Sequence, residues 1–337
     1  MPPQGVELLH VGNNPYHLWV VQRLRRHGGF VVLHDAVLHH LLVEEAANDG
    51  NWERFTADLR FAHGAWGEAL AWARRWGFTG PLDPFLFPAR QAYLRFASGV
   101  IVHSRWAMEK VREELPKLPV RQVPLAVAAL PREGGGELRR ELGVGEDELL
   151  AVHLGFLTPA KGLWEILKAL VVLHELKVRV KLLVVGEGVE APSLRAAVRE
   201  LNLDRFVNFS GFVTAERLGA ILAAADVGLV PRYPTAGETS AAALRFLAAG
   251  RPVIVCGYQQ FLELPQEVAF RIRPGEEGVL DIVRWLAFLA AHPQVLEEKK
   301  QEAKRAWEAG GHAPEEVAQA LIEALGFLLE VGECQTG

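Results

Sequence analysis

Cysteine is rare in this sequence of 337 residues, which contains only Cys256 and Cys334. The two do not form a C-x-x-C pair, so the sequence offers neither a disulfide framework nor a cysteine-based metal motif. Cys256 lies in an apolar, strand-like run and is expected to be a small buried residue, whereas Cys334 lies in a polar tail. Such sparse use of cysteine is typical of reducing compartments, and we therefore predict a cytoplasmic protein.

Long apolar runs and an excess of basic charge are also absent. No segment approaches the roughly 18 apolar residues of a membrane-spanning helix. The first ten residues, MPPQGVELLH, lack the basic and apolar regions of a signal peptide, and we expect none. The formal net charge is −5, and arginine is interspersed with glutamate, which argues against nucleic acid as a partner.

Several common catalytic and nucleotide-binding motifs are missing. The sequence has no G-x-x-x-x-G-K-[ST] phosphate loop and no G-x-S-x-G nucleophile elbow. The G-x-G-x-x-G fingerprint is absent because Gly186-x-Gly188 lacks the third glycine. An α/β oxidoreductase that binds NAD would need this fingerprint, so its absence argues against that class of enzyme.

Histidine is more frequent, but its positions predict no metal site. His34 and Asp35 end a strand-like run, and His39 and His40 follow. These residues could form a metal cluster, but their spacing matches no known ligand pattern, and we predict no metal. The remaining histidines considered belong to no such group and are interpreted as ordinary residues: His10, His17, His103, His153 and His174.

Strand-like and helical segments alternate along the chain, which has 50% apolar and 23% charged residues. This alternation predicts parallel sheets covered by helices on both faces, and the length predicts two such domains. The expected strands are Val6–Val11, Phe30–Leu33, Gly99–Ser104, Val120–Val127, Leu149–Leu154, Val180–Val185, Val207–Phe209, Val227–Val230, Val253–Cys256 and Val268–Arg271.

The domain boundary is expected near Pro131–Gly136, where proline is followed by three glycines. We predict a first Rossmann-like domain over residues 1–130, a linker over 131–136, and a second domain over 137–313. Within the first domain, Trp52–Trp76 is a long amphipathic stretch that we interpret as core packing. The alternative is a helix that lies on a membrane surface.

The most distinctive stretch is Ala236–Pro252, AGETSAAALRFLAAGRP, which lies between two expected strands. A polar turn leads into a helix of small residues, and the start of such a helix favours an anion. The alternative is an ordinary connection in which Thr239 or Ser240 only caps the helix.

Four loops of the second half should meet at one edge of its sheet, because each follows a parallel strand. Lys161 and Arg232 supply positive charge there, and Glu238 supplies a carboxylate. Together with glycines and hydroxyls, these groups suit a ligand with phosphates and ribose-like hydroxyls. The loops are Gly155–Gly162, Gly186–Gly188, Gly211–Thr214 and Arg232–Ser240.

These loops resemble those of the GT-B-fold glycosyltransferases, in particular the large retaining group numbered four, also called glycosyl transferases group 1. The resemblance covers nearly the whole chain and is strongest over residues 150–256. In the first half, Phe30–Asp35 and Val100–Ser104 resemble strands of the same family. The segments that carry the resemblance in the second half are Gly155-Phe-Leu-Thr-Pro-Ala-Lys161-Gly162, Val184-Val-Gly-Glu-Gly188, Phe209-Ser-Gly-Phe-Val213 and the stretch Ala236–Pro252.

The resemblance implies a nucleotide-sugar site and a set of roles. His34 would contact the donor sugar, and Glu238 would hold the sugar with the diphosphate, so these two are the candidate catalytic residues. Lys161 would contact the diphosphate. The other candidate nucleotide-sugar-binding residues are Gly155, Gly186, Gly211, Phe212, Val213, Arg232, Thr239 and Ser240.

The chain departs from the family pattern at three places. Phe156 stands where the family commonly has a basic residue, and Arg232 is the candidate replacement. Arg245 stands where a second glutamate is usual. The first domain is expected to lack its opening strand. A final helix over 314–330 does follow the family pattern, because the resemblance implies that it crosses back to the first domain.

The resemblance implies a cytoplasmic retaining glycosyltransferase that faces its substrates across a cleft between two Rossmann-like domains. It would move a sugar from a nucleotide-sugar donor to a sugar or lipid-linked acceptor, in polysaccharide or glycolipid assembly, without cofactor or metal. Peripheral association with the inner membrane face is a further option, and the sequence carries no signal for an oligomeric state. The alternatives are a nucleotide-sugar-binding protein with impaired catalysis and a GT-B-fold epimerase.

Overall fold

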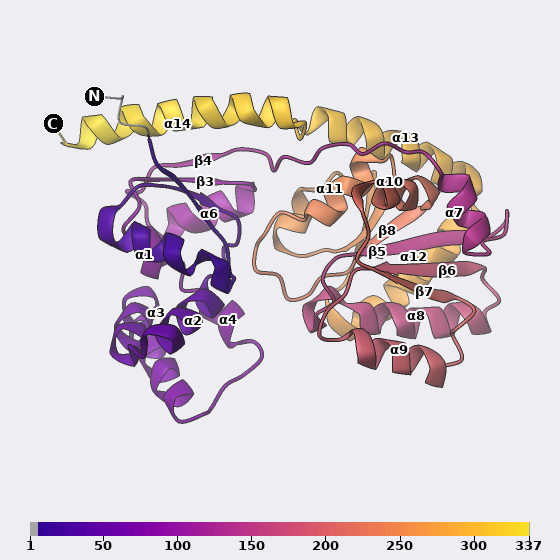
Figure 1. The fold of residues 1–337 in the computed structure, drawn as a ribbon, viewed down its shortest axis with the longest axis horizontal. Coiled ribbons are helices and arrows are strands. Elements are labelled where there is room, and N and C mark those ends of the chain that lie inside the picture. The colour runs from indigo at the N-terminus through magenta and orange to yellow at the C-terminus, as the bar shows by residue number, and fades with distance from the viewer. Residues whose placement is uncertain (1–5, 337) are drawn as a thin grey trace. The chain divides into compact units, whose positions relative to one another are not determined.

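The computed structural model describes residues 6–336, with only the helix backbone described from residue 332 onward. The chain folds into two compact α/β units (Figure 1). Unit 1 comprises the described residues up to Leu125, the loop Pro234–Thr239 and the residues from Glu315; unit 2 comprises Ala126–Tyr233 and Ser240–Pro314. Most of the stretch Ala236–Pro252 therefore belongs to unit 2, but its first four residues belong to unit 1.

Unit 1 is built on a parallel sheet in the order β1-β2-β3-β4. Its strands are β1 (Leu8–Val11), β2 (Phe30–Leu33), β3 (Gly99–Val102) and β4 (Val120–Gln122). Its helices are η1 (Pro15–His17), α1 (Leu18–His27), α2 (His39–Asp49), α3 (Trp52–Arg75), α4 (Asp83–Leu86), α5 (Gln91–Leu94), α6 (Arg105–Glu114) and α14 (Pro314–Thr336).

Helix α14, the last in the chain, covers one face of this sheet (Figure 1). Leu328 is completely buried and packs with Val32 and Ile101 from the strands. A Cβ added to Gly99 would lie 3.1 Å from a methyl group of Leu328, so the small residue lets the helix approach the strand.

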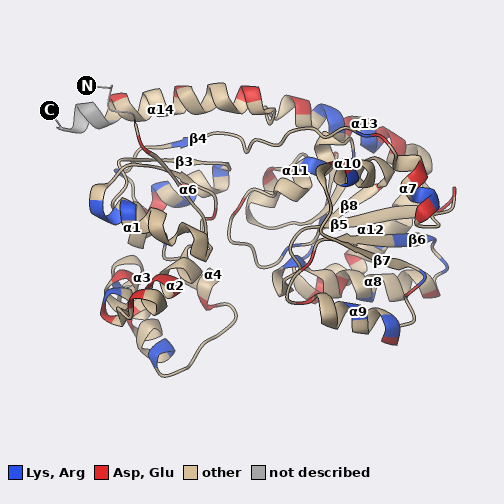
Figure 2. Cartoon of the chain, in the orientation of Figure 1, with Lys and Arg blue, Asp and Glu red and all other residues tan. Residues whose placement is uncertain are grey.

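The other face of the sheet is covered by helices that enclose a buried group of charges. Arg25 on α1 donates to Asp58 on α3 at 2.5 Å and to Glu45 on α2 at 3.2 Å. The Tyr93 hydroxyl donates to Glu45 at 2.9 Å. Figure 2 shows acidic and basic residues interleaved over these helices. Both carboxylates are buried, so loss of one partner would leave an uncompensated charge in the interior. The complete network therefore links the three helices.

Unit 2 is built on a larger parallel sheet in the order β10-β9-β8-β5-β6-β7. Its strands are β5 (Leu149–Leu154), β6 (Val180–Val185), β7 (Val207–Gly211), β8 (Val227–Val230), β9 (Val253–Cys256) and β10 (Ala269–Ile272). Its helices are α7 (Gly135–Glu141), η2 (Pro159–Lys161), α8 (Leu163–Glu175), α9 (Ala191–Glu200), α10 (Ala215–Ala224), α11 (Ala241–Ala248), η3 (Gln259–Glu263), η4 (Gly275–Glu277), α12 (Gly278–Ala291) and α13 (Pro293–Ala309).

The fold class predicted from the sequence, two doubly wound parallel α/β units, is confirmed by these sheets. Cys256 is buried in β9, as expected, and burial raises the pKa of its thiol to about 12. Ser104 caps α6 by accepting a hydrogen bond from the amide of Ala107 at 3.1 Å. No single helix in the described part of the chain is long and apolar enough to cross a membrane. Taken together, the helices Gly275–Ala291 and Pro293–Val331 reach the required length and composition, but the pair is bent by 105°.

The segment Pro131–Gly136, expected as a linker, lies inside unit 2 and packs on α10. A Cβ added to Gly219 would lie 2.1 Å from the Pro131 carbonyl oxygen, and one on Gly135 would lie 2.9 Å from Ala223. The glycines therefore allow close packing of two backbones here. The boundary between the units instead follows Leu125.

The long stretch Trp52–Trp76 is helical, but it is not one continuous helix. Gly64 interrupts α3 with φ of 61° and ψ of −145°. Only glycine adopts such angles readily, so the chain changes direction at this residue.

Candidate active site

Loops at the carboxyl edge of the unit 2 sheet are hydrogen-bonded to one another. The amide of Gly155, after β5, donates to the Val185 carbonyl at 3.0 Å. The amide of Gly186, after β6, donates to the Gly211 carbonyl at the end of β7 at 2.9 Å. Three loops that lie far apart in sequence therefore form one surface.

Glycine is required where these loops meet. A Cβ on Gly186 would lie 2.1 Å from the Gly155 carbonyl oxygen, and one on Gly188 would lie 2.3 Å from the Leu157 carbonyl oxygen. Gly155 and Gly186 also have positive φ values, 146° and 125°. The close backbone contacts leave peptide groups, rather than side chains, at this edge.

Two cations come together beside this surface. Lys161 is the last residue of η2. A Cβ atom added to Gly155 would lie 3.6 Å from the Lys161 Nζ, so the ammonium group lies close to the backbone of Gly155. The amide of Tyr233 donates to the Ala160 carbonyl at 2.9 Å, so the loop that carries Arg232 is attached to the turn that carries Lys161.

His153 on β5 lies close enough to Lys161 and Arg232 for their positive charges to affect its pKa. Its ring is buried, and its Nδ1 lies 3.0 Å from the Leu229 carbonyl oxygen. Burial, together with the positive charges of Lys161 and Arg232, lowers the pKa of His153 to about 3. The sequence analysis treated this residue as ordinary, because its burial beneath two cations depends on contacts between distant segments.

The turn after β7 borders a pocket of about 550 Å³ within unit 2. Gly211 has φ of 69°, and Phe212 is exposed over 77% of its surface. Phe212 and Val213 line the pocket together with Asn208, Ser210, Thr214 and residues of α7 and α10. Phe212 and Val213, two of the predicted nucleotide-sugar-binding residues, therefore lie beside a hollow lined by an exposed ring and polar groups.

Ser240 begins α11, where its hydroxyl accepts a hydrogen bond from the Ala243 amide at 3.2 Å. Its side chain therefore caps the helix, as the simpler interpretation of this stretch predicted. Thr239, the preceding residue, is the last of the loop assigned to unit 1. Arg245 lies on the exposed side of the helix.

Glu238 belongs to a loop that is attached to unit 1. The Thr235 hydroxyl donates to Glu238 at 2.9 Å and accepts from the Gly237 amide at 3.1 Å. The Val37 amide donates to the Ala236 carbonyl at 2.9 Å. The carboxylate is thus oriented by its own turn, and the turn is fastened to the segment that follows His34.

The segment that begins at His34 is fixed by hydrogen bonds to several elements. The His34 amide donates to the Val11 carbonyl at 2.8 Å, and Arg90 donates to the Ala36 carbonyl at 2.6 Å. With the bond from Val37 to the Glu238 loop, these contacts bring the segments of both candidate catalytic residues together in unit 1.

Three histidines form a row across β1, β2 and β3. His10 Nδ1 lies 3.0 Å from His34 Nε2, and His34 Nδ1 lies 3.3 Å from His103 Nε2. His103 Nδ1 lies 3.0 Å from the Val123 carbonyl oxygen. The expectation that His10 and His103 belong to no group is therefore wrong. The parallel sheet pairs His10 with Val32, two residues before His34, so the two rings come from the same face of the sheet.

The histidine row, His10 with His34 and His103, is uncharged at neutral pH. Burial, together with the neighbouring histidines, lowers the pKa of His34 to about 4. Burial likewise lowers the pKa of His10 and of His103. A neutral imidazole carries one N–H and one acceptor nitrogen, so each contact in the row restricts where the protons lie.

The other two histidines of the suspected cluster face different partners. His39 Nδ1 lies 2.8 Å from the Phe87 carbonyl oxygen, and His40 Nδ1 lies 2.9 Å from the Asn13 amide. Over the described residues, no group of three or more histidine, cysteine or acidic side chains is arranged to hold a metal ion.

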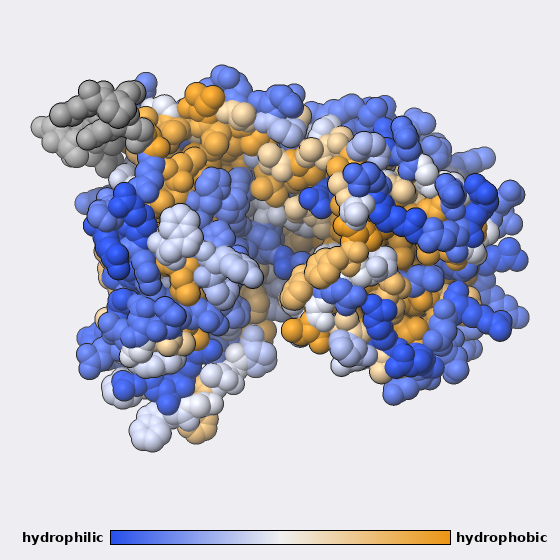
Figure 3. All heavy atoms as spheres, in the orientation of Figure 1, coloured by the Kyte–Doolittle hydropathy of each residue, from blue (hydrophilic) through white to orange (hydrophobic). Residues whose placement is uncertain are grey.

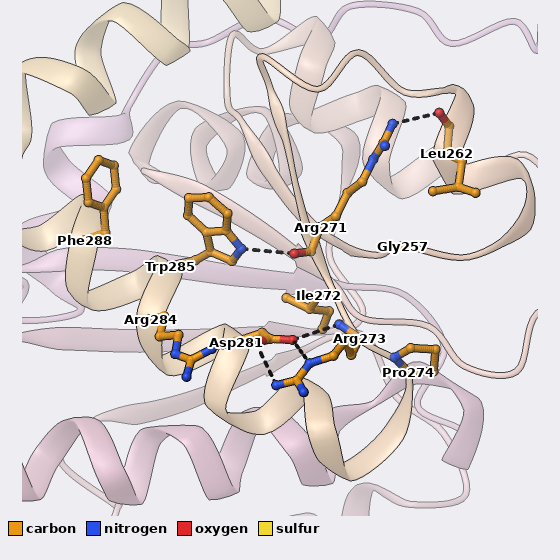
Figure 4. Close-up of a pocket in the computed structure, with 10 residues that line it drawn as sticks. All are labelled: Gly257, Leu262, Arg271, Ile272, Arg273, Pro274, Asp281, Arg284, Trp285 and Phe288. Atoms are coloured by element: carbon orange, nitrogen blue, oxygen red, sulfur yellow. Dashed lines mark hydrogen bonds and ion pairs between the residues drawn. The ribbon is translucent and has the colours of Figure 1, made fainter.

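A further pocket of about 750 Å³ lies beside β10 and α12 in unit 2 (Figure 4). Its charged side chains pair with one another, since Arg273 donates to Asp281 at 2.9 Å. Trp285 donates to the Arg271 carbonyl at 3.1 Å and so caps the edge strand. None of the site residues predicted from the sequence lines this pocket.

Comparison with known proteins finds similarity to glycosyltransferases over part of the chain. Residues 148–286 match the family model described as Glycosyl transferases group 1. An uncharacterized glycosyltransferase, MJ1607 of Methanocaldococcus jannaschii, is 32% identical over 127 residues, which is 37% of this chain and 32% of that protein. Alpha-monoglucosyldiacylglycerol synthase of Acholeplasma laidlawii is 25% identical over 165 residues, which is 47% of this chain and 39% of that protein. The matched segments thus span less than half the length of these curated relatives.

Solved structures share the fold over most of the chain. Sucrose-phosphate synthase from Thermosynechococcus elongatus has a TM-score of 0.68 at 20% identity, covering 96% of this chain and 74% of that one. Anabaena Alr3699/HepE, in complex with UDP and glucose, has a TM-score of 0.63 at 16% identity, covering 96% and 100%. WaaG, a glycosyltransferase involved in lipopolysaccharide biosynthesis, has a TM-score of 0.61 at 16% identity, covering 91% and 81%.

The chain has the fold of the GT-B glycosyltransferases, and its residues 148–286 match the model of the glycosyl transferases group 1 family. That segment contains the loops that carry Lys161, Gly186, Gly211 and Arg232.

Proposed function

We propose that this chain is a retaining glycosyltransferase, which moves a sugar from a nucleotide-sugar donor to an acceptor hydroxyl. The observation that carries the proposal is the surface of interlocked glycine loops beside Lys161 and Arg232, within the segment that matches the family. The solved complexes of HepE with UDP and glucose, and with UDP-glucose, support a donor of this class.

In this proposal unit 2 binds the leaving diphosphate. As the bond to the sugar breaks, negative charge grows on the diphosphate, and Lys161 and Arg232 stabilise it without having to move. Gly155 is partly exposed and has no side chain, which allows the phosphates to approach the backbone there. Protein cations thus take the charge in the proposal, which needs neither a metal nor an organic cofactor.

The candidate residues of unit 1 bind the sugar in the same proposal. Glu238 accepts hydrogen bonds from sugar hydroxyls, and the His34 segment borders the transferred ring. The carboxylate also favours the positive charge that develops on the sugar in an oxocarbenium-like transition state. No protein nucleophile is assigned.

We further propose a lipid-linked acceptor and peripheral contact with a membrane. Several large aromatic side chains are exposed near the end of α3 and in the segment that follows it. In Figure 3 the lower part of unit 1 shows pale and a few orange spheres among blue ones. Trp66 and Trp76 are exposed over 79% and 76% of their surfaces, and Phe78 over 73%. Arg75 lies over the Trp72 ring at 5.0 Å. Tryptophan and arginine together suit the boundary between lipid and water, and the name of the relative from Acholeplasma laidlawii describes the synthesis of a glycolipid.

The chief rival function is nucleotide-sugar binding without transfer. It rests on Phe156, which is exposed over 54% of its surface where the family commonly has a cation, and on the exposed Arg245. A GT-B-fold epimerase is the other rival, and it would change the donor sugar without any acceptor.

A turnover experiment separates these functions. The full chain is incubated with UDP-glucose or GDP-mannose and a panel of sugar and glycolipid acceptors, and the products are followed by proton NMR. The proposal predicts free nucleoside diphosphate together with a glycoside of the donor's anomeric configuration. An inverted product contradicts retention, an altered nucleotide sugar indicates the epimerase, and binding without any product indicates the binding protein.

A further inference from the structure

The pocket of about 750 Å³ beside β10 and α12 is separate from the glycine loops of unit 2. Strand β10 is the first in the order β10-β9-β8-β5-β6-β7, whereas the interlocked loops follow β5, β6 and β7. All the residues that line the pocket belong to unit 2, and its volume is in the range of small-molecule sites. The pocket is therefore a candidate for a second ligand of the same unit.

The backbone of β10 is engaged on both sides. The strand forms one end of the sheet and pairs with β9. Trp285 on α12 donates to the Arg271 carbonyl at 3.1 Å, and Asp281 on α12 accepts from the Arg273 amide at 3.0 Å (Figure 4). These side chains occupy backbone groups that an added strand would need. The pocket therefore suits a small molecule rather than an extended peptide.

Two of the three arginines in the pocket are balanced by carboxylates. Arg273 donates to Asp281 at 2.9 Å and to Glu277 at 3.3 Å. Arg284 donates to Asp281 at 3.4 Å. Two guanidinium groups thus face two carboxylates, and the excess positive charge of the pocket comes from Arg271.

Arg271 is held in place by uncharged groups. Its Nη2 donates to the carbonyl oxygens of Leu262 and Leu264, at 2.8 and 3.4 Å. Figure 4 shows the side chain extended toward Leu262 and away from the pair of Arg273 and Asp281. Both contacts use Nη2, so among the described contacts Nη1 keeps its two N–H donors for an acid group.

An aromatic ring forms a second fixed part of the pocket. The indole of Trp285 is bonded to the Arg271 carbonyl and packs against the Phe270 ring, with 4.8 Å between the ring centroids. Phe270 is buried, so it supports the indole from below the pocket. Leu262, exposed over 49% of its surface, and Pro274 add apolar area to the lining. A fixed ring beside a fixed cation suits a flat ring that carries an acid group.

We propose that this pocket is a second ligand site, which binds an organic anion with a flat aromatic ring and a single acid group. Arg271 binds the acid group through Nη1, and Trp285 contacts the ring. The site lies outside the surface proposed for the nucleotide sugar, and the inference holds whether or not the chain transfers a sugar.

Calorimetry with 2-naphthoate and its uncharged analogue 2-naphthamide tests the role of Arg271 in the full chain. Arg271→Gln should weaken binding of 2-naphthoate about tenfold, because a charge-assisted hydrogen bond is lost, and should leave 2-naphthamide unchanged. Arg199→Gln, at an exposed arginine of α9 outside the pocket, is the matched control and should change neither. If 2-naphthoate does not bind, or binds Arg271→Gln as tightly as the unchanged protein, the proposal is overturned.

Two further variants test where the probe binds. Trp285→Leu should weaken both probes by a similar factor, whereas Trp285→Phe, which keeps a ring, should retain most of the affinity. In proton–nitrogen NMR spectra, 2-naphthoate should shift the indole N–H signal of Trp285, which is assigned by its loss in Trp285→Phe. Lys161→Ala should leave the affinity for 2-naphthoate unchanged. Weaker binding to Lys161→Ala, or an unshifted Trp285 signal, would place the probe elsewhere and refute the second site.

Discussion

The carboxyl edges of the two sheets are built from different chemical groups. In unit 2 the edge consists of glycine backbone with Lys161 and Arg232, and the nearby His153 is held neutral by burial and by these cations. In unit 1 the edge carries the uncharged histidine row and the oriented carboxylate of Glu238. A diphosphate matches the first edge in charge, and sugar hydroxyls match the second in hydrogen bonding. The two edges therefore differ in the kind of ligand group that each can bind.

Acidification should affect unit 1 first. The pKa of six of its histidines is lowered, to about 4 for His34 and His39, whose largest cause is burial. Between pH 6.5 and 4 the unfolded chain takes up protons that the folded unit refuses, so stability falls as pH falls. Each of these two histidines contributes about 3 kcal/mol to that loss.

Hydrogen exchange followed by mass spectrometry, with labelling times corrected for pH, measures the two units separately. Peptides of unit 1 should lose protection at a higher pH than those of unit 2, where the pKa of His153 is lowered to about 3. Simultaneous loss in both units would contradict this difference between them.

Gly186→Ala should disrupt the edge of unit 2. The added methyl group would lie 2.1 Å from the Gly155 carbonyl oxygen, at a φ of 125°. We expect a loss of about 2–4 kcal/mol in unfolding free energy, together with loss of nucleotide binding. Urea unfolding and calorimetry measure the two effects.

Gly275→Ala is the matched control for Gly186→Ala. Gly275 also has positive φ, 65°, but an added Cβ would meet nothing within 4 Å. It should cost about 1 kcal/mol and leave binding intact. Equal effects of the two substitutions would show that backbone angle, rather than contact between the loops, decides the result.

Replacing Trp66 and Trp76 together by alanine should have the smallest effect on folding, because both are largely exposed. If unit 1 carries the membrane contact, flotation with vesicles that contain anionic lipid should decrease about tenfold, which corresponds to about 1.4 kcal/mol. Phe288→Ala in unit 2 is the control on an exposed ring. Unchanged flotation of the double variant would remove the membrane contact from this surface.

The sequence predicted the units and the loops better than it predicted the histidines. Alternating apolar runs identify strands and helices locally, and parallel strands place their following loops at one edge, so Gly155, Gly186 and Gly211 could be grouped in advance. His10, His34 and His103 come from strands far apart in sequence. Only the register of β1, β2 and β3 brings them together, and that register is a property of the fold.

The glycines show a similar limit on sequence analysis. Gly134 to Gly136 have the composition of a linker, but the small size of Gly135 allows close contact with Ala223 on α10. Gly64 lies within a continuous helical pattern, yet it bends α3. The same residue can supply flexibility, close approach or unusual backbone angles, and composition alone does not distinguish these uses.

The central claim is that unit 2 holds the diphosphate of a nucleotide sugar through Lys161. Calorimetric titration of UDP and UDP-glucose into the protein and into Lys161→Ala tests it directly, with Lys168→Ala as control because Lys168 is exposed and pairs with Glu276. The account predicts that Lys161→Ala weakens both ligands about 100-fold, or about 2.7 kcal/mol, and that Lys168→Ala changes neither. Unchanged affinity for UDP in Lys161→Ala would contradict the account.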